Sequence, residues 1–174
     1  MTMQSKPTST ISHVKANEGE HFLAGSDVVT IKLSSQNTAD PMLVVDVRVP
    51  VGGGPPAIHR NPATKVFYFL EGVFNITTVT ADNQQKTTRA EAGDFVAIPT
   101  MAWHNIKNVG DATGRYIGIH SPGQMEPFLR EIGQPISDPL NPPQPKAPAS
   151  HEEQHRLMAL VQDYMEIFPA EQLR

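Results

Sequence analysis

The stretch GPPAIHRNPATKVFYFLEG, residues 54–72, decides how this chain folds. It begins with a glycine–proline turn that neither a helix nor a strand could contain, and it continues into an apolar and aromatic run. In a second stretch, GDFVAIPTMAWHNIKN at residues 93–108, a glycine opens another short apolar run that Pro99 ends. Short apolar runs between turn residues indicate β-strands, and the two stretches carry His59 and His104.

The rest of the chain shows the same succession of strands and turns. Residues 42–49 alternate apolar side chains with Asp46 and Arg48, which predicts a strand with one buried and one solvated face. Turn signals recur about every eight to twelve residues, which is typical of a β-sandwich or a closed barrel. The expected strands are two short ones within 19–38, followed by 42–49, 65–70, 73–80, 85–90, 95–98, 103–108 and 115–120. The sequence therefore predicts an all-β antiparallel barrel.

The composition fits this fold and excludes several classes of function. The 174 residues include 12 glycines and 16 prolines, which suits many turns, and the absence of cysteine excludes disulfides and thiolate metal sites. A formal charge of -4 argues against nucleic acid or an anionic membrane as a partner. No apolar run is long enough to cross a bilayer. Because the N-terminus lacks the apolar core of a secretory signal, we expect a cytoplasmic location.

Four regions follow from the changes in pattern along the chain. Residues 1–16 are polar and unpatterned, which predicts a flexible arm. Residues 17–132 form the expected barrel, with a short outer helix at 124–132. Residues 133–149 contain six prolines and are typical of an extended linker. Residues 150–170 have apolar residues at helical spacing, which predicts an amphipathic helix that docks one face.

The last helix begins with HEEQH at residues 151–155, which matches the helix motif of zinc proteases. In that motif two histidines one turn apart bind zinc and the glutamate acts as general base. The motif here follows a proline-rich linker, and the 19 residues after it cannot build the sheet and substrate cleft of a protease. Acidic groups favour the start of a helix because of its dipole. We therefore interpret the motif as a solvated first turn.

The spacing within residues 54–108 resembles the two sequence motifs of the cupin superfamily. The residues that fall at the family's positions are His59, Gly72, Gly93, Pro99, His104 and Asn108. The phrases at 49–56 and 121–123 are similar to a bacterial subgroup, the quercetin-dioxygenase-like cupins, and the resemblance covers roughly residues 17–168. It implies a double-stranded β-helix, or jelly-roll, barrel with a short C-terminal helical extension. It also implies a homodimer, with the contact on the outer side of Tyr68's strand or on the last helix.

The resemblance further implies a metal site, which is degenerate in this chain. In cupins, motif one supplies two histidines and a glutamate and motif two a third histidine, and together they hold a divalent metal. Here Asn61 stands at the second histidine and Lys65 at the glutamate. An amide oxygen is a weak ligand, and a protonated lysine repels a cation. The expected ligands are His59, His104 and Asn61, joined by His120 if it faces inward, around a weakly held zinc, nickel, iron, manganese or copper ion.

A ligand pocket is expected beside these residues. Its expected lining is Lys65, Phe67, Phe69, Met101, Trp103 and Ile106. Period-two alternation puts the first three on one face of their strand, which is the interior if the register of the family holds. Such a pocket suits a small, flat or apolar molecule held by a few polar groups. The alternative is that the aromatic side chains simply fill a small barrel.

Two classes of function are compatible with this site. The first is a small-molecule-binding barrel in which His59, Asn61, Lys65 and His104 hydrogen-bond an organic, anionic ligand without a metal. The second is a metal-dependent, dioxygenase-like enzyme that acts on a small aromatic or other organic substrate. The lost glutamate favours the first class and the retained histidine pair favours the second. Fold alone does not decide between them, and no catalytic residue is assigned.

Overall fold

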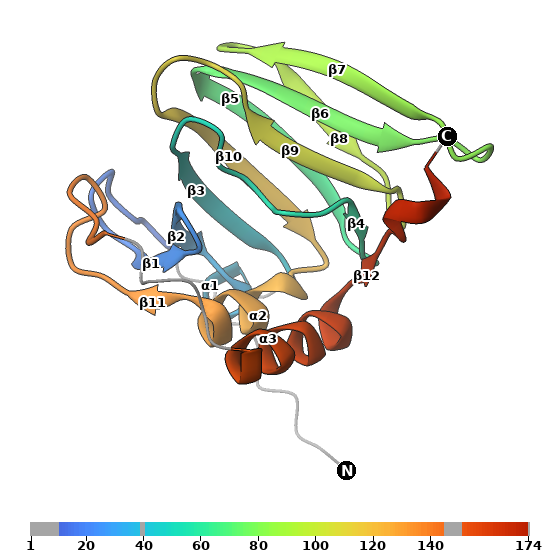
Figure 1. Cartoon of the computed structure of the whole chain (residues 1–174). Coiled ribbons are helices and arrows are strands. Elements are labelled where there is room, and N and C mark those ends of the chain that lie inside the picture. The colour runs from blue at the N-terminus through green and yellow to red at the C-terminus, as the bar shows by residue number, and fades with distance from the viewer. Residues whose placement is uncertain (1–10, 39–40, 145–150, 174) are drawn as a thin grey trace.

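The computed structural model describes residues 11–38, 41–144 and 151–173, with the side chains of 153 and 154 excepted. Its strands form two antiparallel sheets around one core (Figure 1). The larger sheet runs β11-β1-β2-β3-β10-β5-β8, with β1 Glu20–Ala24, β2 Asp27–Leu33, β3 Leu43–Val49, β5 Thr64–Glu71, β8 Phe95–Ile98, β10 Gly114–Ser121 and β11 Gln134–Pro135. The smaller sheet runs β12-β4-β9-β6-β7, with β4 His59–Arg60, β6 Val73–Val79, β7 Gln85–Glu91, β9 His104–Asn108 and β12 Glu166–Ile167. The predicted all-β barrel is confirmed.

The alternation of apolar and polar residues decides which face of each strand is buried. Along β3, buried and half-buried residues alternate without interruption, as the sequence at 42–49 predicts. On β5 the same period buries Lys65, Phe67 and Phe69, while the residues between them are half-buried. Successive side chains of a strand point to opposite faces, so these three share the face toward the core. A lysine thus lies in the same row as two core aromatics.

Three aromatic rings join the two sheets at the centre of the core. Phe69 comes from β5, Phe74 from β6 and Tyr116 from β10, and the first two are completely buried. The Phe69 and Phe74 ring centroids lie 5.0 Å apart, and Tyr116 lies 5.8 Å and 5.7 Å from them. Tilted and edge-on contacts at these distances are favourable for aromatic pairs. This cluster fixes the distance between the sheets on which the site is built.

Gly54 fixes the loop that leads into β4. Its φ is +113°, and a Cβ at this position would lie 2.1 Å from the carbonyl oxygen of Ile106 on β9. Only glycine allows this approach, because any side chain would overlap the backbone. The Gly54 amide also donates to Asp27 Oδ1 at 3.1 Å. The close passage of the loop over β9 brings His59 opposite His104.

The helices lie outside the two sheets. They are α1 Ser35–Thr38, α2 Met125–Ile132, α3 His151–Tyr164 and the 3₁₀ turn η1 Ala170–Gln172. Helices α2 and α3 lie side by side at one end of the barrel (Figure 1), where the Phe128 and Tyr164 rings are 5.4 Å apart. After α3 the chain returns to the smaller sheet, and β12 pairs with β4. No helix among the described residues is long and apolar enough to cross a membrane.

The region boundaries expected from the sequence stay predictions. Within 133–149, expected to be an extended linker, β11 pairs with β1 as a two-residue strand. Residues 145–149 of that linker and most of the arm expected at 1–16 lie outside the described residues. The outer helix expected at 124–132 corresponds to α2, and α3 lies within the helix expected at 150–170.

Candidate functional site

His59 and His104 face each other from neighbouring strands. They are direct partners in the register of β4 and β9, and their ring centroids lie 4.5 Å apart at an interplanar angle of 52°. Both side chains are buried, His59 at 8% and His104 at 2% exposure. The two imidazoles therefore lie next to each other in the interior of the barrel.

Backbone carbonyls orient both imidazoles. His59 Nδ1 lies 3.1 Å from the Ala57 carbonyl oxygen, and His104 Nδ1 lies 2.8 Å from that of Ala102. A carbonyl oxygen only accepts, so Nδ1 of each ring carries the proton and donates it. The Nε2 atom of each neutral ring then has a free lone pair. Two hydrogen-bond acceptors are thus presented together.

Lys65 is buried and hydrogen-bonded to Asn61. Lys65 is 3% exposed, and its Nζ donates to Asn61 Oδ1 at 2.8 Å. The same oxygen accepts from the Ala63 amide at 3.2 Å, and Asn61 Nδ2 donates to Met125 Sδ at 3.3 Å. Both the oxygen and the nitrogen of the Asn61 side-chain amide are therefore hydrogen-bonded. The contact with Met125, at the start of α2, could not be predicted from the sequence, because α2 reaches the site only through the tertiary fold.

His120 faces inward, which the sequence left open. It lies opposite Lys65 in the register of β10 and β5 and is 9% exposed. Its ring meets that of Phe67 edge-on, with centroids 6.2 Å apart. The Nδ1 atom of His120 is buried and has no hydrogen-bond partner among the described residues. A third imidazole thus belongs to the cluster, which we call the histidine–lysine cluster (His59, Asn61, Lys65, His104 and His120).

Burial decides the protonation of this cluster. It lowers the pKa of His104 to about 3, with smaller contributions from His59 and Lys65, and lowers the pKa of His120 to about 3. Burial also lowers the pKa of His59 below its usual range and that of Lys65 to about 8. At neutral pH the three imidazoles are therefore uncharged, and Lys65 is mostly a protonated ammonium.

The residues of the cluster do not fit a divalent metal. In the part of the chain that the structure describes, no three His, Cys, Asp or Glu side chains are grouped so that they could hold a metal ion. The one amide oxygen that could add a ligand, Asn61 Oδ1, already accepts from Lys65 Nζ. The Lys65 ammonium repels a second cation at short range. We therefore derive no chemistry through a metal in this arrangement.

The structure divides the residues expected to line a pocket into two groups. Phe67, Phe69 and Ile106 are buried in the core with Lys65. Met101 lies at the surface with a φ of 58° and 37% exposure. Trp103 packs edge-on against Phe168 at 5.1 Å, and the Arg60 guanidinium lies 4.2 Å from its ring centroid. The lining of a ligand pocket by these six residues stays a prediction.

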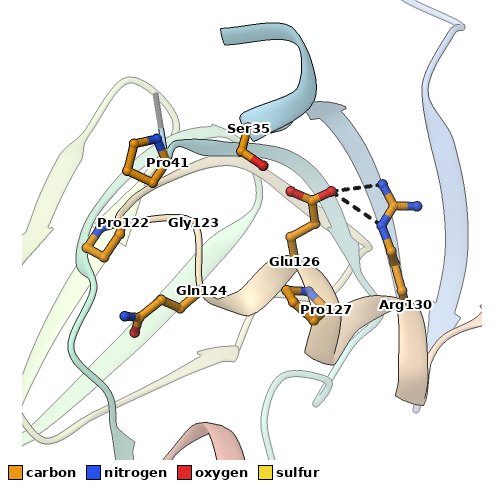
Figure 2. Close-up of a pocket in the computed structure, with 8 residues that line it drawn as sticks. All are labelled: Ser35, Pro41, Pro122, Gly123, Gln124, Glu126, Pro127 and Arg130. Carbon is orange, nitrogen blue, oxygen red and sulfur yellow. Dashed lines mark hydrogen bonds and ion pairs between the residues drawn. The ribbon is translucent and has the colours of Figure 1, made fainter. Parts of the chain in front are cut away.

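Two pockets open outside the histidine–lysine cluster. Figure 2 shows the first, of about 420 Å³, beside the start of α2, where Pro41, Pro122 and Pro127 form much of its wall and Glu126 is bonded to Arg130. The second, of about 450 Å³, lies on the outer face of the larger sheet. Neither includes a residue of the cluster.

The HEEQH motif lies on α3, where His151 and His155 are both exposed. Glu152, which would be the base of a zinc protease, instead pairs with Arg156 at 2.6 Å. The interpretation of this motif as a solvated helix start agrees with these contacts. The motif takes no part in the site.

Comparison with known families agrees with the barrel and with the spacing of its histidines. Residues 45–120 match the model of the cupin domain. This segment contains both histidine-bearing stretches and most of the two sheets, so residues 45–120 form a cupin domain. The chain is also similar to quercetin 2,3-dioxygenase from Bacillus subtilis (strain 168), to which it is 28% identical over 142 residues. The predicted resemblance to the cupins is confirmed.

The relatives differ from this chain in length and in sequence. The match to the Bacillus enzyme covers 81% of this chain but 40% of that enzyme, so the chain spans less than half of its relative. A deletion mutant of Bacillus subtilis oxalate decarboxylase superposes with a TM-score of 0.56 at 14% identity, covering 69% of this chain and 32% of that one. A predicted oxalate decarboxylase from Thermotoga maritima gives 0.53 at 15% identity, covering 63% and 97%. At such identities the structures show a shared fold alone.

The protonation of the cluster makes stability sensitive to acid. The folded-state pKa values of His104 and His120, about 3, lie below the unfolded value of 6.5, so the unfolded chain binds more protons between pH 6.5 and 3. The free energy of unfolding should therefore fall as pH falls through this window, by up to about 1.4 kcal/mol per pH unit for each histidine. Asp27, whose pKa burial raises to about 6, acts in the opposite direction.

Urea titrations between pH 7 and 4.5 measure this slope. Replacing His120 with leucine leaves Asp27 unchanged, so the slope of the variant should be lower by about 1.4 kcal/mol per pH unit. Equal slopes for the two proteins would show that His120 is protonated in the folded state as easily as in the unfolded chain.

Proposed function

We propose that this cupin is a small-molecule-binding barrel whose degenerate metal site works without a metal. The observation that carries the proposal is the 2.8 Å hydrogen bond between Lys65 Nζ and Asn61 Oδ1 in the buried cluster. This one contact joins the two metal-ligand positions at which the sequence departs from the family pattern. The ammonium supplies a positive charge at the place where the family resemblance puts a metal ion.

The chemistry of the cluster suits an organic ligand with an anionic oxygen and a hydroxyl group. The Lys65 ammonium has three N–H donors, of which one is directed at Asn61. A buried ammonium gains most from an anionic partner. The Nε2 lone pairs of His59 and His104 can accept from a hydroxyl, because Nδ1 of both rings is already engaged. Together these groups can hold and orient such a ligand.

A metal-dependent, dioxygenase-like enzyme is the second candidate. The observation that favours it is the paired orientation of His59 and His104, because donation from Nδ1 to a backbone carbonyl is also how metal-binding histidines are commonly fixed. The likeness to a quercetin 2,3-dioxygenase supports the same candidate. Its substrate would be a small aromatic or other organic molecule, and its metal would be zinc, nickel, iron, manganese or copper.

Metal analysis of the purified protein separates the two candidates. We expect untagged protein prepared without chelator to hold far less than one equivalent of any divalent metal. The His59→Ala/His104→Ala variant should hold the same trace amount, because the Lys65 ammonium opposes a cation whether or not the imidazoles are present. Elemental analysis on both proteins measures this. A near-stoichiometric metal that disappears in the variant would establish the metal-dependent enzyme instead.

The remaining partners are proposals of the same kind. We propose that the chain associates with a second copy of itself. The Tyr68 and Phe95 rings support this, because they stack at 4.4 Å on the outer side of β5 and β8, and Phe95 is 70% exposed. Exposed aromatic surface on an outer sheet face is typical of interfaces between subunits. The formal charge of -4 supports neither nucleic acid nor an anionic membrane as a partner.

A further inference from the structure

The pocket on the outer face of the larger sheet lies across four strands. It has a volume of about 450 Å³ and is lined by side chains of β1, β2, β3 and β10, with segments 16–17 and 137–140 as walls. This volume is within the range of small-molecule sites in proteins. The pocket is on the opposite side of the sheet from the core, so a ligand here would not touch the histidine–lysine cluster.

Strand register places a polar row at the base of this pocket. His21 lies opposite Thr30, Thr30 opposite Asp46, and Arg48 opposite Arg115. His21 Nδ1 lies 2.9 Å from the Thr30 hydroxyl oxygen. Direct partners in an antiparallel ladder share a face of the sheet. Asp46 and Arg48 lie two residues apart on β3, so they share one face of the sheet and link the row from β1 with the pair on β10.

The two arginines of the row are in different electrostatic situations. Arg115 binds Asp46 through two hydrogen bonds of 2.9 Å and 2.7 Å, and its Nη1 lies 3.6 Å from Glu71 Oε1. The charge of Arg115 is therefore matched by two carboxylates. Arg48, directly opposite, donates no side-chain hydrogen bond to, and forms no ion pair with, any residue that the structure describes. The carboxylates that neutralise Arg115 leave the guanidinium of Arg48 as the cation of this face that an added anion could pair with.

We propose that this outer pocket binds a small organic monocarboxylate, with its carboxylate on the guanidinium of Arg48. A guanidinium matches a carboxylate with two parallel N–H donors, which gives both strength and orientation. The ligand would be polar, because the Thr30 hydroxyl and the His21 ring line the same pocket. This site is separate from the one proposed above and does not depend on it.

The charges around the pocket favour a single negative charge over two. Arg48 and Arg115 contribute two positive charges, and Asp46 and Asp138 two negative ones. Hydrogen bonds from Asn141 and the Leu140 amide lower the pKa of Asp138, so it is ionised at neutral pH. A phosphate dianion would be repelled by both aspartates, whereas a monocarboxylate on Arg48 is repelled less. Lactate is therefore a suitable probe, and phosphate and neutral lactamide are comparisons.

An NMR titration of the full-length ¹⁵N-labelled chain tests the proposal. At pH 7 and constant ionic strength, lactate should give saturable shifts of backbone amides on β1, β2, β3 and β10. Lactamide and phosphate should give none. The Arg48→Gln variant should bind lactate at least about tenfold more weakly, the loss typical of a hydrogen bond to a charged group. The Arg48→Lys variant keeps the positive charge but loses the two parallel N–H donors of the guanidinium. Its affinity for lactate should therefore lie between those of the wild type and the Arg48→Gln variant.

The matched control is Arg89→Gln, because Arg89 is an exposed arginine of β7 that pairs with Glu91. This variant should titrate like the wild type. Equal binding of lactate by the Arg48→Gln variant, equal binding of lactamide by the wild type, or the absence of saturable shifts at these strands would each overturn the proposal. Sedimentation gives one further outcome that would overturn the proposal. If lactate does not bind and the Arg48→Gln variant changes its oligomeric state, the pocket is a contact between copies of the chain.

Discussion

Replacing Lys65 with glutamate and Asn61 with histidine in one protein is expected to give the barrel a tight metal site. The two substitutions remove the buried ammonium and add a carboxylate and an imidazole beside His59 and His104, whose Nε2 atoms are free. Four such ligands are a usual set for zinc and similar ions. Structural zinc sites release about 10 kcal/mol or more on binding, which corresponds to a dissociation constant of about 10⁻⁷ M or tighter.

Isothermal titration with zinc, nickel and manganese measures this gain. The single variants K65E and N61H separate the two contributions, and we expect each to bind more weakly than the double variant. Adding His104→Ala to the double variant should abolish the site. If the double variant folds and still takes up no metal, then the backbone around the cluster does not place these four positions at metal-binding distances, and Lys65 is not what keeps a metal out.

Replacing Phe74 with alanine is expected to cost about 3–5 kcal/mol of unfolding free energy, the range for buried phenylalanines. Phe74 is completely buried and contacts both Phe69 and Tyr116. It also packs on Gly114, where a Cβ would lie 2.4 Å from the Phe74 ring. The cavity left by the ring would lie between two sheets that are tied together elsewhere, so it cannot close easily.

Urea unfolding of the variant checks this value, and Phe95→Ala is the matched control. Phe95 is also a phenylalanine on a strand, but it is 70% exposed and its main contact is the Tyr68 ring. We expect its removal to cost less than about 1 kcal/mol, because little apolar surface returns to water. Similar losses for the two variants would contradict the position of Phe74 at the centre of the core.

The long strands could be predicted from the sequence because local patterns specify them. The alternation in β3 and β5 and the turns between them depend only on neighbours in the chain. The alternation places Lys65, Phe67 and Phe69 on one face, and the structure shows that this face is buried. Two-residue strands have no such pattern. β4, β11 and β12 exist because a partner strand lies beside them, and that partner is brought there by the tertiary fold.

The site shows the same division between local and tertiary information. The motif spacing located His59 and His104, and the residue types alone indicated that Lys65 opposes a metal. The hydrogen bond from Lys65 to Asn61 and the contact of Asn61 with Met125 could not be predicted, because they depend on rotamers and on where α2 docks. The inward face of His120 depends on the register of β10 against β5, which a single strand does not reveal.

The pairing of β12 with β4 has a consequence for the order in which the barrel assembles. The Arg60–Glu166 contact, at 2.6 Å, joins residues 106 positions apart in the chain. Closing so long a loop costs chain entropy before any contact rewards it, so such pairings form late in folding. The short strand that carries His59 is therefore among the last parts to become fixed. In the folded protein it is also among the first to open, and its backbone amides should exchange with solvent before those of the aromatic core.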